Sequence, residues 1–176
     1  MGMSVSITAA AVQDAEHILK LQYLCYQSEA ALYGDYSIEP LTQTLEDLRA
    51  ELARGHALVA RLGDEVIASV RGEVDEAGVA RIAKLIVHPR MQRHGLGGRL
   101  LGAIETHFAA DSAAKRFQLF TGHRSDRNLR LYRRHGYAPV SELSAGPRLT
   151  VITLEKRVGT AEGAPGRSAG EYTTSA

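Results

Sequence analysis

The sequence predicts one α+β domain in which helices flank a single mixed, mostly antiparallel sheet. Apolar residues recur first at the spacing of amphipathic helices and, from residue 56, at the alternating spacing of strands. The expected order of elements is one strand, two helices, three strands, a helix, a strand, a helix and two strands, with no internal repeat. The 176-residue chain has the size of one domain, which we expect to span residues 1–157.

The first 55 residues predict one strand followed by two helices. Residues 4–8 alternate polar and apolar side chains, as a half-buried strand does. A helix is expected from Asp14 to the break at Gly34, and a second one from Pro40 to Gly55. The apolar stripe of the first helix consists of Ile18, Leu21, Leu24, Cys25 and Leu32, and that of the second consists of Leu41, Leu45, Leu48 and Leu52.

The segment from residue 56 to Pro89 predicts three strands. Residues 56–62 and 66–73 form two strands joined by a Gly63-Asp64 turn, which is a hairpin signal. A third strand covers residues 79–88, and its Leu-Ile-Val run is typical of burial on both faces.

The remaining chain predicts two more helices and the end of the sheet. The helices cover residues 96–113 and 125–135, with a strand over 117–121 between them. A last strand covers 149–155, and one further strand is expected before it. Residues 158–176 contain 14 Gly, Ser, Thr, Ala or Pro among 19 residues, so we expect a disordered tail with little to bury.

Charge and cysteine content exclude several classes of partner. The 21 basic and 20 acidic residues nearly cancel, which argues against nucleic acid and membranes as partners. A single cysteine, Cys25, excludes an internal disulfide framework and favours a reducing compartment, so we expect a cytoplasmic protein. The histidines lack metal-ligand spacing, and no metal ion is expected. Nothing in the sequence decides the oligomeric state, and a homodimer stays open.

A glycine-rich turn follows the buried third strand. Gly95, Gly97 and Gly98 lie where the next helix begins. The first amides of a helix lack internal partners and carry the positive end of its dipole, so such a turn can bind phosphate. A dinucleotide fingerprint would require glycine in place of Leu100, and the Gly-Lys-Ser/Thr of a Walker loop is absent.

Two segments together resemble a known family. The pattern Gln92-x-x-Gly95-x-Gly97, after a strand ending Val-x-Pro, resembles the acetyl-CoA loop of the GNAT superfamily of N-acetyltransferases. The segment Asn128–Tyr137 resembles that family's Leu-Tyr-x-x-x-Gly-Phe/Tyr motif. The resemblance covers roughly residues 4–156 and implies a GNAT-like fold with acetyl-CoA as co-substrate.

The resemblance also implies roles for individual residues. The loop should bind the CoA pyrophosphate, and the edge of the preceding strand should bind the pantetheine arm and polarise the thioester carbonyl. The loop residues are Gln92, Arg93, His94, Gly95, Leu96, Gly97 and Gly98, and the strand residues are Leu85, Ile86 and Val87. Tyr132 matches the tyrosine that protonates the departing thiolate. Many members have asparagine seven residues earlier, where this chain has Ser125, whose hydroxyl can still contact CoA.

The implied reaction is direct acetyl transfer to a primary amine in a ternary complex. Residues 29–51 hold six acids and one base, which favours a small cationic acceptor. Glu29, Tyr33 and Asp35, near the junction of the first two helices, are the candidate acceptor-site residues. The general base stays open between Glu29, Asp35, Glu73, Asp75 and an ordered water. The alternatives are a protein or peptide acceptor and a CoA-binding sensor without turnover.

Overall fold

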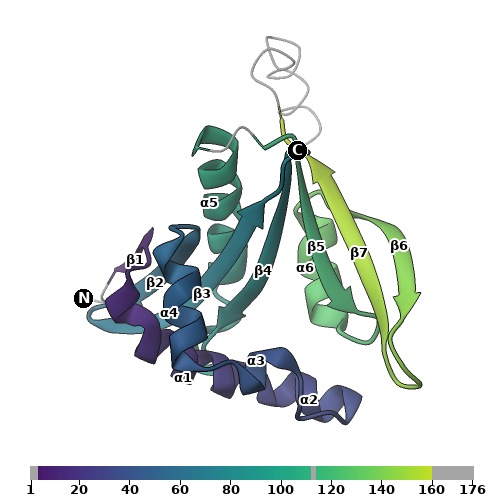
Figure 1. The fold of residues 1–176 in the computed structure, drawn as a ribbon, viewed down its shortest axis with the longest axis horizontal. Helices are drawn as coiled ribbons and strands as arrows, with labels where there is room; N and C mark the ends of the chain where they lie inside the picture. Colours follow the sequence, from purple (N-terminus) through teal and green to yellow (C-terminus); the bar gives the residue numbers. More distant parts are fainter. Residues whose placement is uncertain (1–3, 112–113, 160–176) are drawn as a thin grey trace.

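The computed structural model describes residues 4–111 and 114–159, and the rest of the predicted tail lies outside this range. Its centre is a seven-stranded sheet in the order β1-β2-β3-β4-β5-β7-β6 (Figure 1). Only the β4–β5 pair is parallel, which confirms the predicted mixed, mostly antiparallel sheet. The strands are β1 (Val5–Ala9), β2 (Ala57–Leu62), β3 (Glu65–Val74), β4 (Val79–Val87), β5 (Arg116–Gly122), β6 (Ala138–Ser144) and β7 (Thr150–Arg157).

Helices cover both faces of the sheet, and the alternation of side chains along the strands produces two cores. In β2, Ala57 and Val59 pack with the first group of helices, whereas Leu58 and Ala60 belong to the core on the opposite face. The first group comprises η1 (Val12–Asp14), α1 (Ala15–Cys25), α2 (Gln27–Tyr33), α3 (Glu39–Thr42) and α4 (Leu45–Ala53). The later helices are η2 (Pro89–Met91), α5 (Leu96–Asp111) and α6 (Asp126–Arg134).

Both of the long N-terminal helices that the sequence predicts are interrupted. The first divides at Tyr26 into α1 and α2, and the stripe residues Leu24 and Leu32 are 45% and 37% exposed. The second divides at Gln43, which has an extended backbone, and Thr44 caps α4 by accepting a hydrogen bond from the Asp47 amide at 3.1 Å. The predictions of continuous helices were therefore wrong at these two positions.

A bulge in β4 marks the point where the sheet opens. Ser69 pairs with Ile86 and Arg71 pairs with Ala83, so two residues of β4 lie opposite one residue of β3. One of the two, Lys84, has a φ of 54°, which is uncommon for a residue other than glycine. Strand β4 pairs with β5 only over Val79–Arg81, and the two strands then diverge (Figure 1). The opening between them places the candidate site.

Candidate active site

A cavity of about 730 Å³ lies between the diverging strands β4 and β5. The junction of α1 and α2 and the start of α6 complete its wall. It brings together seven of the residues singled out from the sequence: Leu85, Ile86, Val87, Gln92, Ser125, Tyr132 and Glu29. Residues from three separate parts of the chain therefore meet in one cavity.

Tyr132 extends from α6 into this cavity. Its side chain is only 6% exposed and packs beside Tyr137, with 6.2 Å between the ring centroids. Among the described residues, its hydroxyl has no hydrogen-bond partner. Burial, and secondarily the charge of Glu29, raise the pKa of Tyr132. The hydroxyl is thus protonated at neutral pH and free to donate into the cavity.

Glu29 faces the same cavity from α2. Burial raises the pKa of its carboxyl above the ordinary value, because removal from water disfavours the charged form. Two other candidate bases differ from it. Hydrogen bonds from Ser37 lower the pKa of Asp35, and backbone hydrogen bonds, chiefly from Val79, lower that of Asp75. Glu29 is therefore the more basic carboxylate.

Among the strands of the described residues, none pairs with the β5-facing edge of β4 beyond Arg81. Backbone groups along such an edge can pair with a ligand. The carbonyl of Val87 is already occupied, because Gln92 Nε2 donates to it at 3.1 Å and the Cys25 thiol donates at 3.4 Å. Arg127 donates to the Oε1 atom of Gln92. The side chain of Gln92 thus connects the end of β4 to α6.

The glycine-rich loop lies at the start of α5, next to the end of β4. Arg93 and Gly95 both have positive φ angles, 70° and 75°, which form the tight turn before the helix. A Cβ atom at Gly97 would lie 3.5 Å from Leu131, an ordinary contact, whereas one at Gly98 would lie 2.6 Å from Nε2 of His135. Gly98 therefore permits close packing against the end of α6, while Gly97 has room on the protein side.

Ser125 and Tyr33 are in direct contact. The Tyr33 hydroxyl lies 2.8 Å from Ser125 Oγ and accepts a hydrogen bond from the Arg124 amide at 3.0 Å. Tyr33 itself is 6% exposed and is not among the residues that line the cavity. Asp35 also lies outside it and bonds to Ser37. Of the three candidate acceptor-site residues, Glu29 therefore lines the large cavity, whereas Tyr33 and Asp35 do not.

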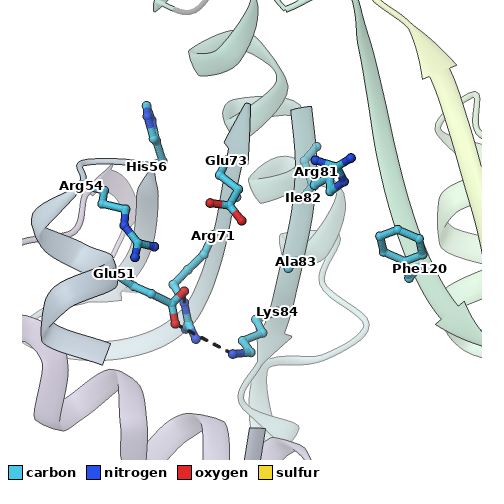
Figure 2. Close-up of a pocket in the computed structure, with 11 residues that line it drawn as sticks. Glu51, Arg54, His56, Arg71, Glu73, Arg81, Ile82, Ala83, Lys84 and Phe120 are labelled. Carbon is cyan, nitrogen blue, oxygen red and sulfur yellow. Dashed lines mark hydrogen bonds and ion pairs between the residues drawn. The ribbon is translucent and has the colours of Figure 1, made fainter. Parts of the chain in front are cut away.

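A smaller cavity of about 210 Å³ adjoins the first along β4 (Figure 2). Ile82, Ala83, Lys84 and Phe120 line both cavities. Arg71 and Glu73 of β3 and Arg54 after α4 line the small cavity. Within the described ranges, the side chains of Glu73 and Arg54 make neither an ion pair nor a hydrogen bond.

Two carboxylates of the acidic segment, residues 29–51, pair with cations that line the small cavity. Glu51 Oε2 accepts from the buried Arg71 guanidinium at 3.2 Å, and Glu39 Oε1 lies 2.6 Å from Lys84 Nζ. Gln43 Oε1 accepts a further hydrogen bond from Arg71 at 3.0 Å. Glu39 and Glu51 neutralise internal cations, and Glu29 is the only one of the six acidic residues in the segment that lines the large cavity.

The sequence did not single out several residues that line the large cavity. Thr121 and Asn128 are two of them, and Asn128 Nδ2 donates to Thr121 Oγ1 at 3.3 Å in the cavity wall. Phe120 is 50% exposed there. Exposed aromatic and apolar side chains of a cavity have the same spacing as core residues, and a distinct sequence signal for them was lacking.

Within residues 4–111 and 114–159, no group of three or more His, Cys, Asp or Glu side chains could hold a metal ion. No helix in that part of the chain is long and apolar enough to cross a bilayer.

Several solved acetyltransferase structures have a similar fold. The PaiA N-acetyltransferase of Thermoplasma acidophilum, in complex with coenzyme A, aligns with a TM-score of 0.74 at 18% identity, over 88% of this chain and 99% of that one. YncA of Salmonella typhimurium, a putative acetyltransferase with its cofactor acetyl-CoA, aligns with a TM-score of 0.71 at 17% identity, over 89% and 95%. A GNAT-family acetyltransferase of Streptococcus pneumoniae gives 0.74 at 19% identity, over 89% and 100%. At these identities the likeness defines the fold class.

The family follows from the sequence itself. A family model described as acetyltransferase (GNAT) family matches residues 16–137, which is more than half of the chain. No match was found among curated proteins. The chain therefore belongs to the GNAT family of acetyltransferases, and the expected enzyme class is confirmed.

Proposed function

We propose that the protein transfers an acetyl group from acetyl-CoA directly to the primary amine of a small cationic metabolite, within a ternary complex. One observation carries this proposal. A single cavity joins the unpaired edge of β4 to Tyr132 and Glu29, with the start of α5 beside it.

The donor would lie along β4. The amides from Arg93 to Gly98 would bind the pyrophosphate, since the first amides of α5 lack partners within the helix. The unpaired edge at Leu85 and Ile86 would bind the pantetheine arm. Ser125, whose side chain lies at the cavity wall, would provide a further contact.

The chemistry then requires one bond to form and one to break. The amine nitrogen attacks the carbonyl carbon of the thioester, and a fixed N–H of β4 stabilises the negative charge that develops on the carbonyl oxygen. The C–S bond breaks, and the sulfur takes a proton from the Tyr132 hydroxyl. Glu29 accepts the proton that the amine loses, and exchange with solvent restores both side chains. One amine and one acetyl-CoA thus give one amide and one CoA thiol.

Glu29 supports this choice of base and acceptor. Its pKa is raised while those of Asp35 and Asp75 are lowered, and a more basic carboxylate removes a proton more readily. The same negative charge would attract an acceptor in its ammonium form, which must release one proton to solvent before the neutral amine attacks.

The first test is a calorimetric titration of the protein with acetyl-CoA, with ATP and NADH as controls. Selective binding of acetyl-CoA supports the donor site, and its absence in a folded sample overturns it. A screen for CoA thiol release then compares polyamines, aminoglycosides, amino acids and lysine-containing peptides. Release with a small amine supports the acceptor class. Release only with peptides or proteins, or binding without any turnover, overturns it.

A further inference from the structure

The C-terminal end of α2 reaches across the open end of the sheet to the loop between β5 and α6. Tyr33 contacts Ser125 and the Arg124 amide there. The carbonyl of the next residue, Gly34, accepts a hydrogen bond at 3.0 Å from Nη1 of Arg148, which lies in the loop between β6 and β7. Both contacts lie on the β5–β7 side of the opening, whereas α1 packs against β3 and β4. In Figure 1, α2 lies below the gap between β4 and β5.

The position of Tyr33 is fixed on several sides. A Cβ atom at Gly122 would lie 2.0 Å from the Tyr33 hydroxyl and 2.4 Å from Cζ, so only glycine leaves room for this ring. The ring of His123 lies 6.1 Å away, centroid to centroid. His123 is held in turn by the Thr150 amide, which donates to its Nδ1 at 3.0 Å. The Tyr33 hydroxyl therefore has one defined place.

Counting donors and acceptors fixes the direction of the hydrogen bonds. A phenol has one proton to donate and two lone pairs. The Arg124 amide uses one lone pair of the Tyr33 oxygen, because an amide can only donate. Within the described residues, Ser125 Oγ is the one acceptor in reach of the buried Tyr33 proton. A buried donor without an acceptor costs free energy, so Tyr33 donates to Ser125.

The consequence concerns the proton of Ser125. When its oxygen accepts from Tyr33, its own O–H is left to donate elsewhere, and Ser125 lines the large cavity. We propose that Tyr33 is a positioning residue, which directs the Ser125 hydroxyl as a hydrogen-bond donor to a carbonyl oxygen of the CoA pantetheine arm. This inference rests on the proposed function. It assigns Tyr33 to the binding of acetyl-CoA, in place of the expected role in binding the amine.

Four variants test the inference: Tyr33→Phe, Ser125→Ala, the double variant, and Tyr23→Phe as a matched control. Tyr23→Phe also removes one partly buried hydrogen bond, because the Tyr23 hydroxyl donates to the Gln43 carbonyl at 2.7 Å, but Tyr23 does not line the large cavity. Affinity for acetyl-CoA is measured by calorimetry. Adenosine 3′,5′-bisphosphate serves as a second probe, because it contains phosphates and adenosine but no pantetheine arm.

Tyr33→Phe and Ser125→Ala should each weaken acetyl-CoA binding about tenfold, the effect of one hydrogen bond. The double variant should be no weaker than either, because both changes remove one contact. The bisphosphate should bind all variants alike, and Tyr23→Phe should match the wild type. Additive losses, equal losses for both probes, or unchanged acetyl-CoA binding would overturn the inference.

The two proposals fail in different ways. Wild-type binding of acetyl-CoA with no loss in the Tyr33 and Ser125 variants refutes the positioning role alone. Absence of acetyl-CoA binding in the wild type refutes the donor site and the positioning role together. If Tyr33→Phe does not fold, Gly122→Ala replaces it, because the added Cβ displaces the Tyr33 hydroxyl without removing it. Gly122→Ala should then weaken acetyl-CoA binding and leave bisphosphate binding unchanged. Absence of this difference counts against the inference.

Discussion

The charge of Glu29 raises the pKa of Tyr132 across the large cavity, although the two residues lie on different helices and far apart in the sequence. Burial, and then the charge of Glu29, raise the pKa of Tyr132, while burial raises the pKa of Glu29 itself. One group is thus held as a stronger base and the other as a protonated donor. This division suits a reaction that removes a proton from the amine and delivers one to the sulfur.

Replacing Tyr132 by phenylalanine should lower kcat by about 10- to 1,000-fold, because the departing sulfur loses its proton donor. The affinity for acetyl-CoA should change little, since the ring stays in place. Steady-state kinetics and calorimetry on the same preparation measure the two effects. Tyr36→Phe is the control, because Tyr36 is 59% exposed. An unchanged kcat would remove Tyr132 from this role.

Replacing Glu29 by glutamine should lower kcat/KM by about 100-fold at neutral pH. In the wild type, kcat/KM should fall as the pH drops through the raised pKa of Glu29, because the protonated acid cannot accept a proton. That acidic limb should disappear in the variant once the ionisation of the amine is taken into account. Persistence of the limb would assign the base to another group or to water.

The same substitution should raise stability. A carboxyl whose pKa is raised in the folded state opposes folding wherever it is ionised, which is above that pKa. Glu29→Gln should therefore have a higher Tm than the wild type at pH 7, and the difference should shrink as the pH falls through the raised pKa. Thermal unfolding at several pH values measures it, and a lower Tm at pH 7 would contradict it.

The loop glycines should separate stability from binding. Gly97→Ala should leave the free energy of unfolding nearly unchanged, because the added Cβ makes only ordinary contacts, but it should weaken acetyl-CoA binding at the approached amides. Gly95→Ala should cost about 1–2 kcal/mol of stability, because its φ of 75° disfavours a side chain. Chemical denaturation and calorimetry measure the two quantities. Equal effects of both variants on stability would contradict this difference.

Cys25 should be a poor nucleophile despite its place in the cavity wall. Burial raises the pKa of its thiol to about 11, so at pH 8 only about one thiol in a thousand is ionised. Alkylation by iodoacetamide should be about 100-fold slower than that of free cysteine, as mass spectrometry can follow. A rate equal to that of free cysteine would show that the thiol is not protected.

Most of the fold could be predicted from local patterns. Alternation along residues 56–62 and 66–73 placed the first hairpin, and Pro89 placed the end of β4. The break at Tyr26 could not be predicted, because Leu24 and Leu32 continue the helical stripe while they line a cavity. Spacing alone does not distinguish a core from a cavity wall. Thr44 with Asp47 three residues later was a capping signal that could have located the start of α4.

The site was predictable where a motif is local and unpredictable where it depends on distant partners. Gln92, Ser125 and Tyr132 were found from short segments and do meet in one cavity. The partners of Glu39 and Glu51 are Lys84 and Arg71, which lie on strands that follow much later in the chain. Tyr33 and Ser125 are 92 positions apart. Such pairings follow from tertiary packing, so the sequence gives no local sign of them.

The crossing of α2 has a mechanical consequence. Strands β4 and β5 are joined at one end of the opening by their three residue pairs. At the other end, α1 packs against β4 and is followed by α2, whose Tyr33 and Gly34 bond to the loops after β5 and β6. A cleft with contacts at both ends resists opening, whereas a cleft with contacts at a single end can open by a hinge motion. The separation of β4 and β5 is then constrained at both ends of the opening by contacts within the chain.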